Sequence, residues 1–159
     1  MKYNRFEELP VWKAAIELAV GVFKLTARPA FRRYYSIRNQ LERSAMSVSN
    51  NIAEGFERGT TQELLTFLYI ARGSSGETRS ALCFCERLDG FGDLKFEISD
   101  LKSRAEEVSR QLRAWAGSLQ DSDVPGQRYL TNRSRQASKA AREREEFLKE
   151  LEEIRNRKR

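Results

Sequence analysis

Residues 49 to 63 read SNNIAEGFERGTTQE, and this stretch contains the signals for the end of one helix and the start of another. Gly59 suits the left-handed position that often follows a helix end. Residues 60 to 63 have the Ser/Thr-x-x-Glu form of a capping box, in which Thr60 is the N-cap and Glu63 reaches back to it. The stretch therefore predicts a short connection between two helices.

Apolar residues continue on both sides of this connection at three- and four-residue steps, the spacing of one face of a helix. They predict one helix over about 37–56 and another over about 64–88. The second helix contains RGSSGE at 72–77, and each of its glycines costs a helix about 1 kcal/mol relative to alanine. Because the apolar pattern resumes beyond this segment, we expect one continuous helix with a small-residue face for close packing. That face consists of Gly73, Gly76 and Ser80.

Two further helices complete the pattern. One is predicted over about 11–25, with Pro10 in its first turn, where proline is tolerated, and Pro29 beyond its end. The other follows a DGFGD loop at 89–93 and extends over about 96–119. Four amphipathic helices with short connections predict an all-α fold, an antiparallel up-down-up-down four-helix bundle.

The bundle is predicted to occupy residues 1–120, followed by a linker at 121–130 and a basic helical or partly disordered tail at 131–159. Residues 1–127 contain 18 Lys and Arg against 17 Asp and Glu, whereas residues 128–159 contain 11 against 6. Such a tail is expected to attract nucleic-acid phosphates without reading bases. A solvated helix or a coiled-coil arm between protomers is the alternative, because the tail also has six Glu and a weak heptad. The candidate nucleic-acid-binding residues of the tail are Arg128, Arg133, Arg135, Lys139, Arg142, Arg155, Arg157, Lys158 and Arg159.

A second basic segment, at residues 28–38, combines cations with aromatic rings around the sequence FRRYYS. This composition suits phosphate contact and the stacking of single-stranded bases. A solvated, partly packed loop is the alternative reading of the same residues. The candidate nucleic-acid-binding residues here are Arg28, Arg32, Arg33, Tyr35 and Arg38.

Polar residues lie at the margin of the apolar stripes of the second and third predicted helices. Buried polar groups need hydrogen-bond partners, so we expect these residues to bond across a structural seam between the two helices. The seam residues are Ser47, Asn51 and Glu54 on one helix and Gly73, Ser74 and Glu77 on the other. A site formed by the paired carboxylates of Glu54 and Glu77 is the sharper alternative, but it has no His or further Asp to support it.

The chain has no histidine, which removes imidazole bases, Ser-His and Cys-His pairs and His-containing metal sites. We therefore expect no enzyme activity, no catalytic residue, no metal and no cofactor. Cys83 and Cys85 lie two apart on a predicted helix and are expected to be reduced packing residues. No secretion signal or long apolar segment is evident, so we expect a cytoplasmic protein without membrane contact.

Three parts of the sequence together resemble a known family. They are FEELPVWKAAIELA at 6–19, SNNIAEGFERGTTQELLTFLYIARGSSGE at 49–77, and the loop and helix that follow. Over roughly residues 3–120 the chain resembles the four helix bundle protein family, also called 23S rRNA intervening-sequence proteins. That family looks related to the accessory variability determinant of diversity-generating retroelements. The basic tail lies beyond the resemblance.

The resemblance implies a four-helix protomer that assembles into a ring-like homopentamer without known catalytic activity. For the retroelement branch it implies a basic adaptor that binds the reverse transcriptase of the element and its RNA or DNA. We therefore expect a non-enzymatic, homo-oligomeric adaptor that binds nucleic acid, a reverse transcriptase or both. The alternative is a protein of the ribosomal-RNA intervening-sequence type that acts as an oligomeric protein-interaction scaffold without direct nucleic-acid binding.

Overall fold

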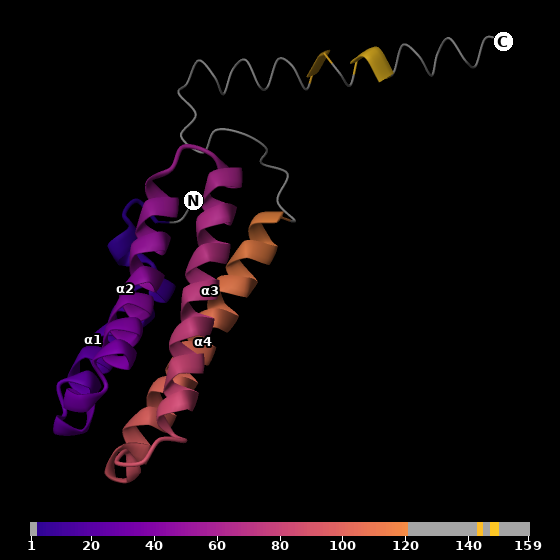
Figure 1. Ribbon diagram of the computed structural model, residues 1–159. Helices are drawn as coiled ribbons and strands as arrows, with labels where there is room; N and C mark the ends of the chain where they lie inside the picture. Colours follow the sequence, from indigo (N-terminus) through magenta and orange to yellow (C-terminus); the bar gives the residue numbers. More distant parts are fainter. Residues whose placement is uncertain (1–2, 121–142, 145–146, 150–159) are drawn as a thin grey trace. The chain divides into compact units, whose positions relative to one another are not determined.

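The computed structural model describes residues 3–120, 143–144 and 147–149, and the chain divides into two units, residues 1–126 and 127–159. The first unit is a bundle of four long helices, which confirms the predicted all-α class (Figure 1). The described residues of the second unit are helical and exposed. The long helices are α1 (Pro10–Thr26), α2 (Tyr35–Glu57), α3 (Thr61–Cys85) and α4 (Lys95–Gln120). Three short 3-10 turns are η1 (Phe6–Glu8), η2 (Pro29–Arg33) and η3 (Gly92–Leu94).

The capping signal before α3 works largely as predicted. Thr60 Oγ1 accepts a hydrogen bond from the backbone N–H of Glu63 at 3.2 Å and donates one to Glu63 Oε2 at 2.8 Å. The prediction of a left-handed Gly59 is wrong, because Gly90, at φ 91°, is the only described residue with positive φ. The chain instead leaves α2 through an extended Arg58 (φ −70°, ψ 150°), and after Gly59 it continues through an extended Thr60 (φ −119°, ψ 153°).

Helix α3 passes through residues 72–77 without a break, which confirms that RGSSGE belongs to one continuous helix. The predicted close packing of its small-residue face is wrong within the protomer. A methyl group added at Gly73 or Gly76 would meet no atom within 4 Å. The helix instead buries the hydroxyl residues Ser74, Ser75 and Thr78.

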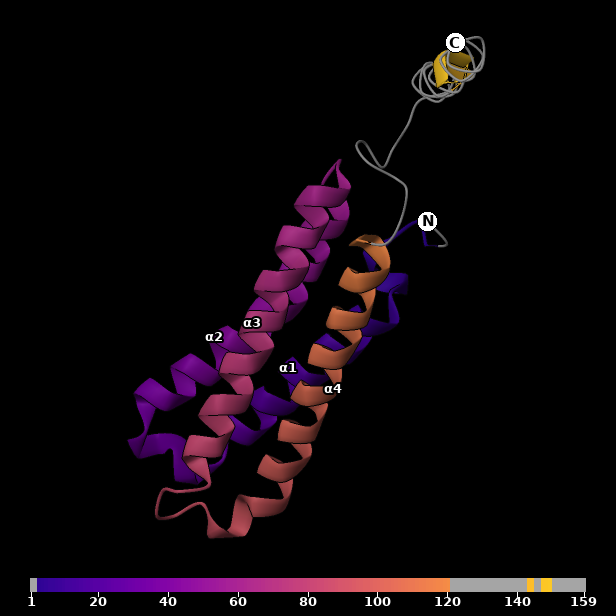
Figure 2. The same cartoon turned by 90° about the vertical axis from the view of Figure 1, so that its right-hand side faces the viewer.

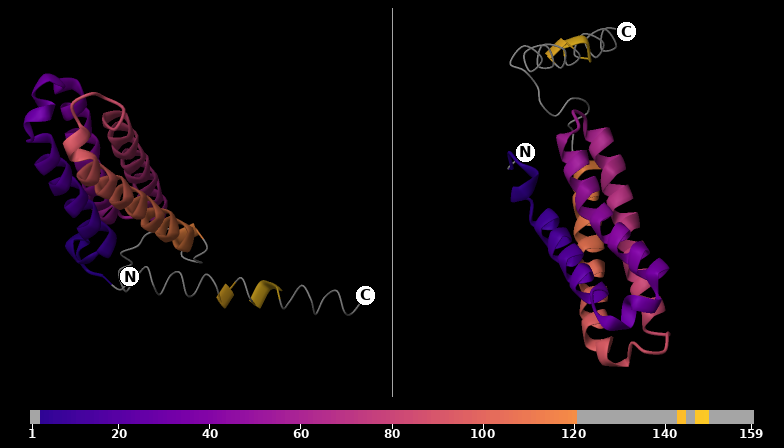
Figure 3. Two further views of the ribbon diagram at one scale, coloured as in Figure 1. Left: turned by 90° about the horizontal axis from the view of Figure 1, so that it is seen from below. Right: turned by 60° about the vertical axis from the view of Figure 1, so that its left-hand side comes forward.

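Each helix packs mainly against two others. Helix α1 contacts α2 and α4, and α3 also contacts α2 and α4; Figures 2 and 3 show these neighbours from several sides. The core consists of two clusters along the bundle. One is centred on Leu18, Leu41, Leu82 and Ile98, and the other on Ala15, Ile52, Leu68 and Leu112.

Candidate interaction surfaces

Arg33, one of the predicted nucleic-acid-binding residues, holds two connections of the fold together. Its Nη2 donates to the carbonyl oxygen of Asp89 at 3.0 Å, and the Tyr34 hydroxyl donates to the same oxygen at 3.2 Å. The Phe91 ring packs against Phe31 at 4.8 Å and against Tyr34 at 5.3 Å between centroids. These contacts join the segment between α1 and α2 to the segment between α3 and α4. The Arg33 guanidinium is therefore hydrogen-bonded within the protomer.

Arg38 also takes part in internal contacts. Its Nε donates to Glu42 Oε1 at 2.8 Å, and the same carboxylate oxygen accepts a bond from Thr26 Oγ1 at 2.7 Å. Thr26 is buried on α1, so the carboxylate links α1 to α2 and draws Arg38 toward this junction. The Arg38 side chain remains about half exposed.

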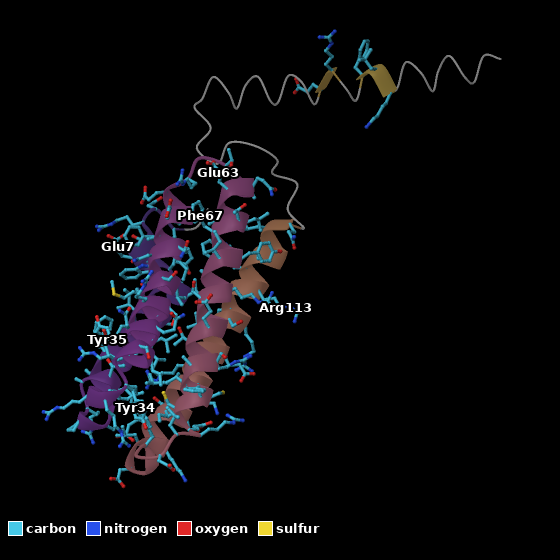
Figure 4. All side chains as sticks on the ribbon, in the orientation of Figure 1. Glu7, Tyr34, Tyr35, Glu63, Phe67 and Arg113 are labelled. Atoms are coloured by element: carbon cyan, nitrogen blue, oxygen red, sulfur yellow. The ribbon has the colours of Figure 1, made fainter. Side chains whose placement is uncertain are left out.

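The remaining candidates of the 28–38 segment, Arg28, Arg32 and Tyr35, are exposed. Figure 4 places Tyr35 near the same end of the bundle as Tyr34, far from Glu63. Tyr35 lines a groove that it shares with Phe23, Met46 and the cations Arg38 and Arg43, whereas Arg28 lines a different groove, between α1 and α4. All five predicted residues are thus exposed, Arg33 and Arg38 also make contacts within the protomer, and Arg28 lines a different groove from Tyr35 and Arg38.

The nine basic candidates of the tail lie outside the described residues. They are Arg128, Arg133, Arg135, Lys139, Arg142, Arg155, Arg157, Lys158 and Arg159.

Three of the predicted seam residues meet between α2 and α3. Ser47 Oγ lies 2.9 Å from Ser74 Oγ, and Asn51 Nδ2 donates to the carbonyl oxygen of Ser47 at 2.7 Å and to its Oγ at 2.9 Å. The Asn51 amide is therefore bonded within the protomer. Gly73, also predicted for the seam, is exposed on the outer side of α3.

A deeper set of hydroxyl contacts was not predicted from the sequence. Thr78 Oγ1, fully buried, donates to Ser44 Oγ at 2.9 Å, and Ser75 Oγ donates across to the carbonyl oxygen of Ala105 on α4 at 2.7 Å. Buried hydroxyl groups need such partners, and these contacts join three helices. The available signal was that Thr78 and Ser75 continue the apolar stripe of Leu68 and Ala71 at helical spacing.

Glu54 and Glu77 do not come together as a carboxylate pair. Glu54 forms an ion pair with Arg58, whose guanidinium also lies 5.0 Å from the centre of the Phe67 ring. Glu77 Oε2 accepts a hydrogen bond from Gln40 Nε2 at 3.4 Å. Within the described residues, no group of three or more His, Cys, Asp or Glu side chains could hold a metal ion.

In the described bundle, the groups whose pKa values are shifted are buried or take part in structural contacts. Burial raises the pKa of Cys85 to about 11, so its thiol is protonated and unreactive at neutral pH. The hydrogen bond to Glu86, at 2.7 Å, raises the pKa of Lys102, and hydrogen bonds from Gln111 and Arg110 lower the pKa of Glu107. These groups lie apart from the grooves described above.

The large apolar side chains exposed on the described bundle include two groups on its outer faces. On α1 and α2, Val20, Phe23 and Met46 are 48%, 41% and 45% exposed and line a groove of about 500 Å³. On α3, Tyr69 and Ile70 are 44% and 45% exposed. Grouped apolar side chains at a protein surface are typical of contact with another molecule. Neither group was predicted from the sequence, because apolar spacing along a helix indicates the core and does not identify exposed apolar residues.

None of the helices in the described ranges has the length and hydropathy required of a membrane-spanning segment.

Solved structures that resemble the bundle include one from a bacterium. It is the crystal structure of a protein with unknown function from the S23 ribosomal protein family of Bacteroides thetaiotaomicron. The TM-score is 0.61 at 20% sequence identity, and the match covers 67% of this chain and 97% of that chain. This likeness shows that the two proteins share a fold.

The sequence comparisons identify the family. No curated protein matches the chain. The family model of the 23S rRNA-intervening sequence protein matches residues 7–114, a stretch that includes all of α1, α2 and α3 and most of α4. The chain therefore belongs to the 23S rRNA-intervening sequence protein family.

Proposed function

We propose that this protein is a non-enzymatic, homo-oligomeric adaptor of the cytoplasm, a pentamer, that binds nucleic acid, a reverse transcriptase or both, as in a diversity-generating retroelement. The observation that carries the proposal is the presence of two different exposed apolar faces on one protomer, around Phe23 and around Tyr69. Two different faces that fit each other join copies head to tail, and such contacts close into rings when the rotation permits. The family resemblance supports five copies.

Charge supplies the affinity for nucleic acid in this proposal. Residues 128–159 carry 11 Lys and Arg against 6 Asp and Glu, and each copy in an oligomer contributes one such tail. Several weakly binding tails on one particle bind a long strand much more tightly than one tail does. Arg28, Arg32 and Tyr35, exposed near one end of the bundle, offer further contacts to phosphate and base.

The salt dependence of binding to a fluorescent single-stranded RNA tests this role. Each neutralised phosphate contributes about −0.7 to the slope of log K against log salt for single strands. A full-length variant with Gln at the nine basic tail candidates should bind more weakly and with a shallower slope. A variant with Gln at Lys95, Arg104 and Arg113 on the bundle is the control. Equal affinity and slope for the wild type and the tail variant would contradict the role of the tail.

A second function, a protein-interaction scaffold without direct nucleic-acid binding, is favoured by the balanced charge of the bundle. Residues 1–127 have 18 basic against 17 acidic side chains, and Arg33 and Arg38 are engaged in internal contacts. An oligomer that binds neither RNA nor DNA at low salt would support the scaffold over the adaptor. Co-purification with a reverse transcriptase encoded beside this gene would support the retroelement role.

A further inference from the structure

The groove that Tyr35 lines lies beside the junction of α1 and α2, where the exposed charge is positive. Glu42, its acidic residue, is only 19% exposed, and its Oε1 accepts hydrogen bonds from Thr26 Oγ1 at 2.7 Å and from Arg38 Nε at 2.8 Å. Arg43 is exposed, and no described residue forms an ion pair or a side-chain hydrogen bond with it. The carboxylate is therefore neutralised at the junction, and the exposed charge belongs to Arg38 and Arg43.

The same groove combines these cations with exposed aromatic rings. Its volume is about 420 Å³, and it lies between Phe23 of α1 and a row on α2 formed by Tyr35, Asn39 and Arg43. The members of the row are four residues apart, so they lie on one face of the helix. Tyr35 is the first residue of α2 and is 73% exposed (Figure 4). We call this surface the Tyr35 groove.

The chemistry of the Tyr35 groove fits a single strand of nucleic acid. An exposed aromatic ring offers a stacking surface to a base that is not paired, whatever its identity. Guanidinium groups bind phosphate oxygens through charge-assisted hydrogen bonds. The Asn39 side-chain amide bonds to no described residue, so it can donate to and accept from the edge of a base. An acidic peptide or a nucleic-acid duplex would use the cations alone, because neither presents an unstacked base to Tyr35.

The spacing of the row suits a base and a neighbouring phosphate. Tyr35 and Arg43 are eight residues apart, which corresponds to about 12 Å along the helix axis, and the long arginine side chain shortens this separation. A base on Tyr35 and the backbone of the next nucleotide can therefore be bound at the same time.

We infer that the Tyr35 groove binds a segment of single-stranded nucleic acid, with one base stacked on Tyr35 and a neighbouring phosphate bound by Arg43 and Arg38. The Asn39 amide bonds to the edge of the stacked base. The inference rests on the proposed nucleic-acid binding, and it adds a defined site on the bundle that is separate from the basic tail.

Substitutions of Tyr35 and Arg43 test the site, because neither residue lines the apolar groove of about 500 Å³ between α1 and α2. Binding of the full-length protein to fluorescent polyadenylate is measured over a range of salt concentrations. Tyr35→Ala should weaken binding roughly ten-fold without changing the slope of log K against log salt, and Tyr35→Phe should bind like the wild type because its ring still stacks. Arg43→Gln should make the slope shallower by about 0.7 for each copy that contacts the strand.

Matched controls come from other helices of the bundle. Phe84→Ala removes an exposed ring from α3 and Arg113→Gln removes an exposed cation from α4, and neither residue lines the Tyr35 groove. Both controls should keep the affinity and the slope of the wild type. Circular dichroism should show wild-type helix content in all variants. A loss of affinity in Phe84→Ala as large as in Tyr35→Ala would overturn the inference.

The kind of nucleic acid gives a further readout. The loss caused by Tyr35→Ala should be the same for polyadenylate and polydeoxyadenylate, since neither contact involves the sugar, and it should be absent for duplex RNA, whose bases are already stacked. An equal loss with the duplex would overturn the stacking role of Tyr35.

Ultraviolet crosslinking to polyuridylate, followed by mass spectrometry of the digested protein, locates the strand directly. The peptide that contains Tyr35 should carry a nucleotide adduct, and Tyr35→Ala should abolish it. Adducts on other peptides alone, those of the tail included, would overturn the inference.

The outcomes separate the two proposals. A wild-type protein that binds no single strand at low salt would refute nucleic-acid binding, and this inference with it. Wild-type binding that Tyr35→Ala and Arg43→Gln both leave unchanged would refute only the site in the Tyr35 groove.

Discussion

The Gly90→Ala substitution should destabilise the bundle markedly, because Gly90 meets two constraints at once. Its φ of 91° lies in the left-handed region, where an L side chain costs about 1–2 kcal/mol. The added Cβ would also lie against Arg33 Nη2, closer than unbonded atoms can approach. Arg33 would have to move and give up its 3.0 Å bond to the carbonyl oxygen of Asp89, a loss of about 1 kcal/mol for this exposed contact.

The total expected loss is about 2–3 kcal/mol in the free energy of unfolding, measured by urea denaturation at one fixed protomer concentration. Gly92→Ala is the matched control, since Gly92 lies two residues further along the same connection and has no atom within 4 Å of a Cβ. In an Arg33→Ala background, Gly90→Ala should cost only the backbone part, about 1–2 kcal/mol. Equal losses for Gly90→Ala and Gly92→Ala would refute the reasoning, as would a cost of Gly90→Ala that is independent of Arg33.

Three further predictions concern single contacts. Thr60→Ala removes the N-cap of α3 and should cost about 1 kcal/mol in urea unfolding, whereas Thr66→Ala, an exposed hydroxyl on the same helix, should cost much less. Ser75→Ala removes the buried bond to the Ala105 carbonyl and should cost about 1 kcal/mol, against little for the exposed Ser103→Ala; equal costs would contradict a role for burial. Burial raises the pKa of Cys85 from 9.0 to about 11, so the folded state holds this proton longer than the unfolded state, and stability should fall as pH rises from about 9 to 11. Cys85→Ala should reduce that fall, and iodoacetamide at pH 8 should modify Cys85 only after unfolding.

The helices could be predicted because their signals are local. The periodic apolar residues, Pro10 at the start of α1 and the Thr60–Glu63 cap before α3 each act within about one turn of the chain. The error at Gly59 has the same origin. A glycine permits the left-handed conformation without requiring it. Here an extended Arg58 ends α2 and turns the chain toward Thr60, so no left-handed residue is needed.

The roles of the polar and basic residues depended on partners far away in sequence. Arg33 looked like a phosphate-binding cation, but its hydrogen-bond partner lies 56 residues further along the chain. Ser47 lies against Ser74 between α2 and α3, yet the buried bonds of Thr78 and Ser75 were not predicted, because hydroxyl groups on a helix can also point to solvent. Only packing decides which of these groups is buried.

By itself the sequence determined that this chain is an all-α bundle of the 23S rRNA-intervening sequence protein family with a basic tail, because helix periodicity and motif order are properties of the chain alone. The tertiary structure decided which charges are free and which faces are uncovered. Gly73 and Gly76 show the difference. Their small size predicted close packing with another helix. Only the arrangement of the four helices revealed that no atom of the protomer lies within 4 Å of a Cβ at either position.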